Sequence, residues 1–241
     1  MEPKILVGVI TYSGQKYCFF DFIDALKKQD YPNFDVLFID NSDSDEYFDF
    51  LKGQKINVVR NKVFGGRFEK ILSSRRLLRK LFLENKEYEC LFMVDSDIVL
   101  SRDALRKLVD TNKDLVSGVY LVARKLKDRI RMSPVVFEYI NEEQSRWMKI
   151  EDVIEKRVFP IACAGLGITL AKRAVIEKVD FRLMPSGAGE DIAFYVDARG
   201  AGFEVVCNSG VKGLHLPYPL LDPRTKLYDW EEYRRRLKKS I

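Results

Sequence analysis

Two aspartates follow a wholly apolar segment, in the run Asp95-Ser96-Asp97 directly after Leu91–Val94. Side chains two positions apart at a strand end can turn toward one ligand, and two carboxylates held that close repel each other unless a cation or a proton lies between them. Mg²⁺ and Mn²⁺ prefer carboxylate oxygens and keep coordination positions free for phosphate oxygens. The run therefore predicts a site for a divalent cation and a diphosphate, with a plain turn of solvated acids as the alternative.

The chain contains one histidine, His215. Imidazole is a good ligand for Mn²⁺, so His215 would complete a metal site that Asp97 begins. A hydrogen-bonded histidine without a ligand is the more common situation and is the alternative. Because there is no second histidine and no Gly-x-Ser-x-Gly turn, the sequence argues against zinc hydrolases and serine hydrolases.

A second pair of acids, Glu190 and Asp191, follows the glycine-containing run Pro185–Gly189 and precedes a helical pattern. Acids at a helix N-terminus often serve only to complement the helix dipole. A carboxylate on a mobile loop would also be placed to remove a proton from an acceptor hydroxyl. The glycines supply the freedom that a closing loop needs.

Arg75 interrupts the apolar stripe of a helix expected over Arg67–Leu83. The stripe residues recur at helical spacing and are Phe68, Leu72, Leu78 and Phe82. An arginine in such a stripe needs a partner, and Asp40, a bound phosphate or another structural ion pair would each serve. The Gly65-Gly66 pair before this helix is by itself only a weak indication of phosphate binding.

The elements that must position these residues alternate short apolar runs with longer amphipathic stretches, which is typical of an α/β fold. The expected strands are Ile5–Ile10, Val36–Ile39, Ile56–Val59, Leu91–Val94, Leu115–Val122, Gly165–Ala171 and Phe203–Cys207. The expected helices are Tyr17–Gln29, Asp45–Leu51, Arg67–Leu83, a helix capped by Ser101 and ending at Asp110, Lys172–Val179 and Ile192–Ala198. In open parallel sheets ligands bind beyond the carboxyl ends of the strands, which is where the polar residues of this chain fall.

Charge and composition argue against several classes of function. The 241 residues have a net charge of +5, and +4 of it lies in the last eighteen residues, where seven basic residues face three acidic ones. The nearly neutral body argues against a nucleic-acid binder. No apolar stretch is long enough to span a membrane, and the first residues show no leader sequence. The four cysteines form no CxxC pair and are expected to be reduced and mostly buried, which favours a cytoplasmic protein.

Two segments fit this pattern less well. In the basic tail, Trp230, Tyr233 and Leu237 recur at spacings of three and four, so this helix would make a peripheral contact with anionic lipid at the cytoplasmic membrane face. A terminal helix packed on the domain is the alternative. The segment Arg124–Arg157 has a loose pattern and is expected to be an insertion or a flexible cover over the acceptor.

Taken together, the motifs resemble those of glycosyltransferases with the GT-A fold, close to the family 2 group of nucleotide-sugar transferases. The resemblance rests on segments in the right order over most of the chain: Val9–Tyr12, Val36–Ser42, Asn61 with Gly65-Gly66, Phe92–Asp97, Gly165–Gly167, Gly189–Asp191 and Gly213–His215. It implies a Rossmann-like α/β fold with a mixed, mainly parallel sheet flanked by helices. It also implies one catalytic domain over residues 1–223, with a nucleotide-binding half (1–100) and an acceptor half (101–223), followed by a basic C-terminal helix (224–241).

The resemblance assigns roles residue by residue. Thr11 and Asp40 would form the nucleotide pocket, with the aspartate at the base. Asp95 would contact the ribose or a metal-bound water and is counted with the metal ligands, while Asp97 and His215 would bind Mn²⁺ or Mg²⁺ at the diphosphate. The other residues expected at the donor are Asn61, Arg67, Arg75, Ser96, Gly165 and Gly167. Arg67 is an alternative to Arg75, because the family's arginine usually follows the two glycines more closely than Arg75 does.

The implied activity is metal-dependent transfer of one sugar from a UDP-sugar or GDP-sugar to an acceptor hydroxyl. Asp191 would act as general base with inversion, and Glu190 beside it would touch the acceptor. The acceptor remains open between a saccharide, a lipid-linked saccharide and a small polyol. Polymerisation is disfavoured because the Gln144–Trp147 run precedes Glu190-Asp191, whereas the corresponding element of processive synthases follows the acidic pair.

Three alternatives were weighed against this interpretation. A retaining transferase would use Asp191 to position the acceptor, and a non-catalytic nucleotide-sugar binding protein would keep only the fold. A nucleotidyltransferase usually opens with a glycine-rich loop containing Arg and Lys, and Val9–Gly14 is not such a loop.

Overall fold

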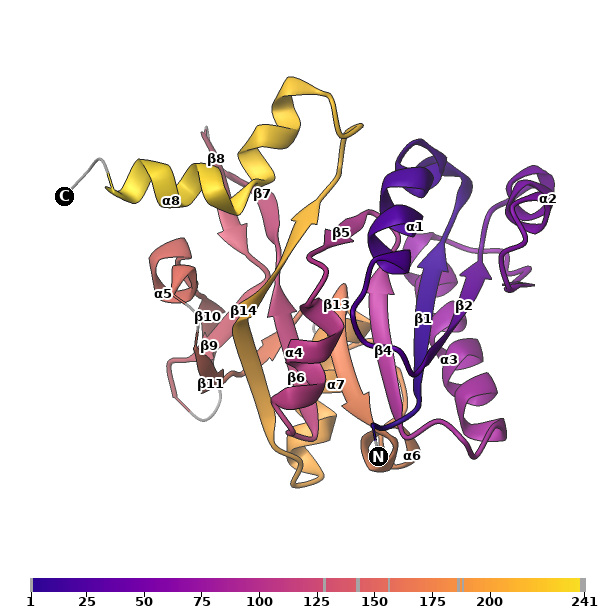
Figure 1. Ribbon diagram of the computed structural model, residues 1–241. Helices are drawn as coiled ribbons and strands as arrows, with labels where there is room; N and C mark the ends of the chain where they lie inside the picture. The colour runs from indigo at the N-terminus through magenta and orange to yellow at the C-terminus, as the bar shows by residue number, and fades with distance from the viewer. Residues whose placement is uncertain are drawn as a thin grey trace.

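The computed structural model describes residues 2–127, 129–141, 144–155, 157–185, 187 and 189–238, without the side chains of residues 236–238. Within these residues, a nine-stranded sheet forms the centre of the molecule (Figure 1). Its strands are β1 (Ile5–Thr11), β2 (Phe34–Asp40), β3 (Val58–Arg60), β4 (Cys90–Asp95), β5 (Ile98–Leu100), β6 (Leu115–Val119), β11 (Val158–Pro160), β13 (Ile168–Lys172) and β14 (Val205–His215). The order is β11-β14-β6-β13-β4-β1-β2-β3, with β5 paired to β14 outside this path.

The sheet is mixed and mainly parallel, as expected. Strands β3, β2, β1 and β4 are parallel neighbours, and β6 runs parallel to β14. Strand β13 is antiparallel to both β4 and β6, and β5 and β11 are antiparallel to β14. The strands that carry Thr11, Asp40 and Asp95 therefore end at the same edge of the sheet.

Helices cover both faces of this sheet (Figure 1). One face packs against α1 (Phe19–Lys27), α2 (Glu46–Gly53) and α4 (Ala104–Asp110), and the other against α3 (Arg67–Glu84), α6 (Arg173–Lys178) and α7 (Glu190–Gly200). Alternate residues of β4 serve the two layers, since Phe92 packs on the first face and Leu91 and Met93 on the second. Burial on both faces explains why these strands appear in the sequence as unbroken apolar runs.

The segment expected to be a flexible cover is regular structure instead. It contains the hairpin of β7 (Leu121–Leu126) and β8 (Arg129–Pro134), the short helix α5 (Ile150–Ile154), and two strands of a three-stranded sheet, β9 (Val136–Tyr139) and β10 (Ser145–Trp147). The third strand of that sheet is β12 (Cys163–Ala164). The sequence pattern is loose because these small sheets bury only part of each strand.

Several expected boundaries were wrong. The strand expected over Leu115–Val122 is divided at Tyr120 between β6 and β7. Helix α4 is preceded by Asp103 as its N-cap residue, while Ser101 donates its hydroxyl to Asp103. Strand β14 extends to His215, far beyond the expected end at Cys207. Its middle contains polar residues and a register shift between Cys207 and Lys212, which conceals the strand in the sequence.

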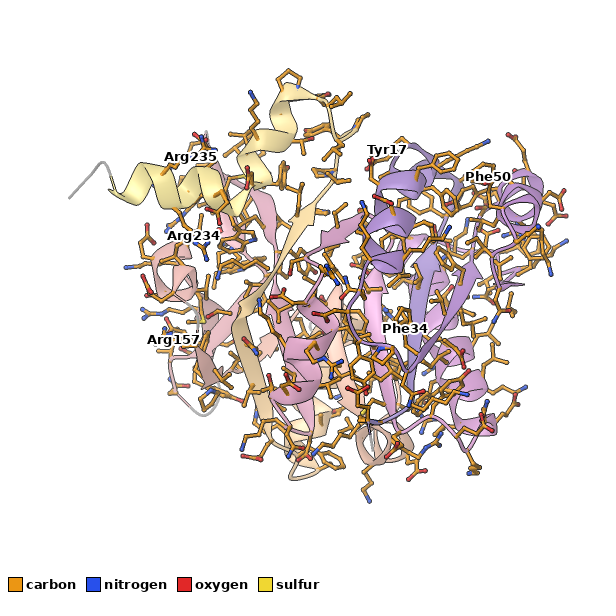
Figure 2. The ribbon with its side chains drawn as sticks, in the orientation of Figure 1. Tyr17, Phe34, Phe50, Arg157, Arg234 and Arg235 are labelled. Atoms are coloured by element: carbon orange, nitrogen blue, oxygen red, sulfur yellow. The ribbon has the colours of Figure 1, made fainter. Side chains whose placement is uncertain are left out.

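The C-terminal segment consists of the 3₁₀ helix η2 (Pro223–Tyr228) and α8 (Trp230–Lys238), and residues 239–241 of the expected basic helix lie outside the described residues. Trp230 is only 5% exposed and donates its indole N–H to the carbonyl oxygen of Gly213 at 3.1 Å. Tyr233 also packs on the core. Trp230 and Tyr233, two of the three apolar residues expected to meet lipid, thus pack on the domain, and the side chain of the third, Leu237, lies outside the described residues. Arg234 and Arg235 lie on the same helix (Figure 2).

Two expectations drawn from the composition concern the cysteines and the possibility of membrane-spanning helices. All four cysteines are buried and unpaired. No helix in the described part of the chain has the length and hydropathy that a bilayer span requires.

Gly213 lies where β14 packs closely on β5 and β13, and this packing yields a test of the fold. A Cβ atom there would lie 2.5 Å from Cγ2 of Ile98 and 2.6 Å from Cδ1 of Ile168. We expect Gly213→Ala to lower the free energy of unfolding by about 1–3 kcal/mol through overpacking, measured by urea denaturation. The matched variant Gly200→Ala, in α7 with no atom near its added Cβ, should raise it by about 0.5 kcal/mol. Equal effects of the two substitutions would contradict this packing.

Candidate active site

A cavity of about 740 Å³ opens at the carboxyl edge of the sheet. The strands β1, β4 and β14 contribute Thr11, Asp95 and His215 to its wall. Asp97 lines it from the turn after β4, and the N-terminal residues of α7, Glu190 and Asp191, line it from the second helical layer. The two acidic pairs and the single histidine, far apart in the sequence, therefore share one cavity.

Asp97 and His215 form a close pair. Strand β5 pairs with β14 in antiparallel register, with His215 opposite Ile98, so Asp97 lies next to the histidine. The carboxylate oxygen Oδ2 of Asp97 is 3.5 Å from Nε2 of His215. The backbone N–H of Leu216 also donates to the carbonyl oxygen of Asp97 at 2.7 Å. Backbone pairing thus fixes the spacing of the two side chains.

The ring of His215 is held in one orientation. Its Nδ1–H donates to the carbonyl oxygen of Leu121 at 2.9 Å, which leaves Nε2 directed at Asp97. The rings of Tyr120 and Tyr228 meet it edge-on, with centroid distances of 5.7 and 5.6 Å. Burial lowers the pKa of His215, but the hydrogen bond and the charge of Asp97 outweigh burial, so its pKa is raised overall.

A residue near the start of the chain contacts the segment that follows β14, beside the Asp97–His215 pair. Tyr17, in the 3₁₀ helix η1 (Ser13–Cys18), donates its hydroxyl to the carbonyl oxygen of Leu216. Figure 2 shows Tyr17 on the side of η1 that faces the C-terminal segment. The residue after His215 is therefore anchored to both η1 and the Asp97 turn.

Arg75 lies between the two acidic pairs and is 3% exposed. Its Nη2 is 3.1 Å from Oδ1 of Asp95, and its Nε is 3.8 Å from Oε1 of Glu190. Nε and Nη1 have no hydrogen-bond partner among the described residues. The partners of Arg75 are thus Asp95 and Glu190, so a structural ion pair is the alternative that the structure shows, and Asp40 is not the partner.

Two carboxyl groups of the cavity have raised pKa values. Burial raises the pKa of Asp95. The charge of Arg75 lowers this pKa, whereas the charges of Asp97 and Glu190 raise it further. Burial also raises the pKa of Asp191 to about 6, and the charge of Glu190 acts in the same direction. A carboxyl group with a pKa near 6 is a better proton acceptor at neutral pH than an ordinary aspartate.

Thr11 lines the cavity, and Ser96 supports it from behind. The hydroxyl of Ser96 donates to Oε1 of Gln15 at 2.6 Å and lies 3.0 Å from Oγ1 of Thr11, which is 3.3 Å from the hydroxyl of Tyr47. Ser96 is buried and does not reach the cavity wall. Its side chain ties the turn after β4 to β1.

Asp40 and Asn61 lie behind the cavity wall. Asp40 is fully buried, with Arg60 Nη1 3.0 Å from its Oδ2, while its Oδ1 accepts from the backbone and hydroxyl groups of Ser42. Asn61 donates to the hydroxyls of Ser73 and Ser74. Asp40 was expected to contact the nucleotide base. In this structure Arg60 and Ser42 bind both oxygens of its carboxylate instead. The residues after it that do line the cavity are Asn41, Ser42 and Asp43.

The N-terminus of α3 also opens on the cavity. Gly65, Arg67 and Lys70 line it, and Arg67 is exposed without an ion pair within the described part of the chain. Lys70 pairs with Asp43 across the cavity entrance. Arg67 and Arg75 therefore both reach the cavity, one at its exposed end and one deep within it.

Gly165 and Gly167 act through close packing. Neither lines the cavity, whereas Leu166 between them does. A Cβ at position 167 would lie 2.8 Å from Oδ2 of Asp95 and 3.0 Å from the ring of Tyr120. The absence of a side chain there lets the Asp95 carboxylate and Tyr120 approach β13.

Some lining residues carry no motif and were missed in the sequence. Gln15, Tyr120 and Val122 belong to this group. Gln15 follows the polar end of β1, which was a usable signal. Tyr120 sits at the break between β6 and β7, and nothing in the local sequence distinguishes it from an ordinary strand residue.

The residues present fit a divalent cation bound together with a substrate. No group of three His, Cys, Asp or Glu side chains in the described ranges is arranged to hold a metal ion. The Asp97–His215 pair offers one oxygen and one nitrogen ligand, and the ring is oriented through Nδ1 as metal-binding histidines commonly are. Such a pair suits Mg²⁺ or Mn²⁺ completed by phosphate oxygens.

No protein-family model and no curated protein matches this chain. Among solved structures, A197 from STIV is similar over 90% of this chain and 87% of its own, with 19% identity and a TM-score of 0.53. S. aureus TarS is similar over 87% of this chain, with 18% identity and a TM-score of 0.52, and this chain spans only 36% of it. TarS 1-349 has been solved with UDP (TM-score 0.52, 18% identity) and with UDP-GlcNAc (0.51, 17%), over 87% of this chain and 60% and 58% of that chain. These likenesses show that the chain shares its fold with A197 and TarS.

Removal of Arg75 should expose the repulsion among the acids. We expect Arg75→Met to lower the free energy of unfolding by about 3 kcal/mol at pH 8, because Asp95 and Glu190 lose their counter-charge. The folded-state pKa of Asp95 would rise further, so the deficit should shrink as the pH falls to 5 and the carboxyl groups gain protons. Urea denaturation at the two pH values measures this, with exposed Arg67→Met as the control. A deficit independent of pH would show that Arg75 serves only packing.

Proposed function

We propose that the chain is a glycosyltransferase that transfers one sugar from a nucleoside-diphosphate sugar to an acceptor hydroxyl. The observation that carries this proposal is the shared cavity, where the Asp97–His215 pair lies with Asp191, whose pKa is raised to about 6 by burial. The fold shared with TarS, which has been solved with UDP and UDP-GlcNAc, supports a nucleotide-sugar donor.

The donor nucleotide would occupy the end of the cavity formed by β1, the loop after β2 and the start of α3. Thr11, Asn41 and Ser42 offer hydroxyl and amide groups to a base and ribose, and Arg67 offers a cation to phosphate. We propose UDP or GDP as the nucleotide. Asp40 would act indirectly, by fixing Ser42 and the loop that meets the base.

Asp97 and His215, with Asp95 close to them, would hold Mn²⁺ or Mg²⁺. The cation, when bound, would neutralise charge on the leaving diphosphate. The chain's own contribution is orientation, because Leu121 and the two tyrosines fix the imidazole before any ligand enters.

Asp191 would be the general base of an inverting reaction. Its carboxyl group lies at the N-terminus of α7 on the cavity wall, where it would accept the proton of the acceptor hydroxyl as that hydroxyl attacks the sugar. Glu190 beside it would contact the acceptor while remaining paired with Arg75. We propose a saccharide, a lipid-linked saccharide or a small polyol as the acceptor, in a reaction that ends after one sugar.

The four buried, unpaired cysteines fit a reducing compartment, so we propose a cytoplasmic enzyme, with residues 1–223 as its catalytic domain.

Two substitutions test the metal pair. We expect Asp97→Ala and His215→Ala each to lower Mn²⁺-dependent turnover of a UDP-sugar or GDP-sugar by about 100-fold or more, because each removes a proposed ligand. Turnover is measured as nucleotide release across a panel of sugar nucleotides. Exposed Lys178→Ala provides a control for handling and folding. Unchanged turnover in both variants would remove the proposed site.

Asp191 provides the test of the activity itself. Asp191→Asn should lower kcat by about 10²- to 10⁴-fold with little change in donor binding, since the amide cannot accept the proton. In the wild-type chain the base form exists above its pKa, so activity should fall about tenfold per pH unit below about pH 6. NMR of the product should show an inverted anomeric configuration. Retention of configuration would instead give Asp191 the positioning role of a retaining enzyme.

A further inference from the structure

The segment of the β7–β8 hairpin contains five basic residues and one acid, Asp128, which lies outside the described residues. Four of its basic side chains are exposed and have no ion pair within the described part of the chain: Lys125, Lys127, Arg129 and Arg131. Two described basic side chains of α8 differ, because Arg234 pairs with Glu231 and Arg235 with Glu232. Among the described side chains, the hairpin therefore carries more cations without an ion pair than α8 does.

The strand register increases this charge density. Arg124 lies directly opposite Arg131, so two guanidinium groups share one face of the hairpin. Like charges directly opposite in an antiparallel pair are destabilising. Arg124 stacks on the ring of Trp147, with 4.2 Å from its guanidinium carbon to the ring centroid, whereas Arg131 is exposed. An anionic partner would relieve this repulsion.

The hairpin also carries an exposed apolar side chain. Ile130 is 73% exposed and lies opposite Lys125, on the face of the hairpin away from Arg129 and Arg131. A polyanion that offers only phosphate or carboxylate groups would leave Ile130 unburied. A bilayer with anionic headgroups would accept both the cations and the isoleucine.

The root of the hairpin belongs to the active site. Val122 lines the cavity, and the carbonyl oxygen of Leu121 holds His215. Lys127 lies five positions after Val122 along an extended chain, a span of about 17 Å. A membrane bound at the turn of the hairpin would therefore lie at a fixed distance from the cavity. Figure 1 shows the hairpin at the upper left of the molecule, near α8 in that view, and α6 at the bottom.

We propose that the tip of the β7–β8 hairpin docks on an anionic lipid membrane, in place of the contact expected from the C-terminal tail. Trp230 and Tyr233, two of the three apolar anchors expected in the tail, pack on the domain instead. The hairpin supplies exposed cations and an exposed apolar side chain together. This surface stands independently of the proposed chemistry.

The test is sedimentation of the full chain with phosphatidylcholine vesicles, with or without about one third phosphatidylserine. The wild-type chain should bind only the anionic vesicles, and less at high salt. Lys125→Glu with Arg129→Glu should weaken binding at least tenfold. The matched pair Lys86→Glu with Lys178→Glu makes the same change in net charge on exposed residues elsewhere and should retain binding within about threefold. Ile130→Ser keeps the charge and should weaken binding by about tenfold, as expected when one aliphatic side chain is no longer buried.

Equal losses in the two double variants would overturn the proposal, because net charge alone would then explain binding. Loss of binding with Arg234→Glu and Arg235→Glu, but not with the hairpin variant, would assign the contact to the tail. Binding to nucleic acid or to an acidic polysaccharide without binding to vesicles would also overturn it. Since none of these assays uses turnover, failure of this inference and failure of the proposed function are distinguishable.

Discussion

The mutual repulsion of Asp95, Asp97, Glu190 and Asp191 within one cavity is the constraint on which the rest of the site depends. Arg75 and His215 are the basic groups that lie among them, the first between Asp95 and Glu190 and the second beside Asp97. Burial raises the pKa values of Asp95 and Asp191, and the charges of the neighbouring acids raise them further. A site with excess negative charge at the carboxyl edge of a sheet favours two kinds of ligand: a cation, and a hydroxyl group that can donate its proton. Glycosyl transfer requires both.

The architecture around this cavity brings distant parts of the chain to the same point. Antiparallel pairing of β5 with the end of β14 sets His215 next to Asp97. The C-terminal segment then packs back on β14 through Trp230 and on the histidine ring through Tyr228. Tyr17 near the beginning of the chain contacts the residue that follows His215. The geometry of the proposed metal site therefore depends on tertiary contacts over nearly the whole chain.

The sequence allowed good prediction of the sheet and of the residues at its strand ends, because strands buried on both faces are continuous apolar runs and polar residues stand out where they stop. Asp95, Asp97, Glu190, Asp191 and His215 were each recognisable for this reason or by residue type. Partners were harder to predict. Arg75 was identified as a buried cation, but its pairing with Glu190 joins residues more than one hundred positions apart, and the capture of Asp40 by Arg60 is equally invisible in one dimension. The hairpin and the long β14 were missed because half-buried strands and strands with irregular register give weak periodicity.

The central claim is that nucleotide binding and cation binding occur together at the Asp97–His215 pair. The most direct measurement is thermal unfolding of the full chain with UDP, GDP and their sugars, each with and without Mn²⁺, in the wild type and in Asp97→Ala. We predict that one nucleotide raises the Tm of the wild type by about 5 °C or more at saturating concentration, only when Mn²⁺ is present, and that Asp97→Ala abolishes this rise. The account would be contradicted if no nucleotide raised the Tm, or if the rise were the same without the cation and in the variant.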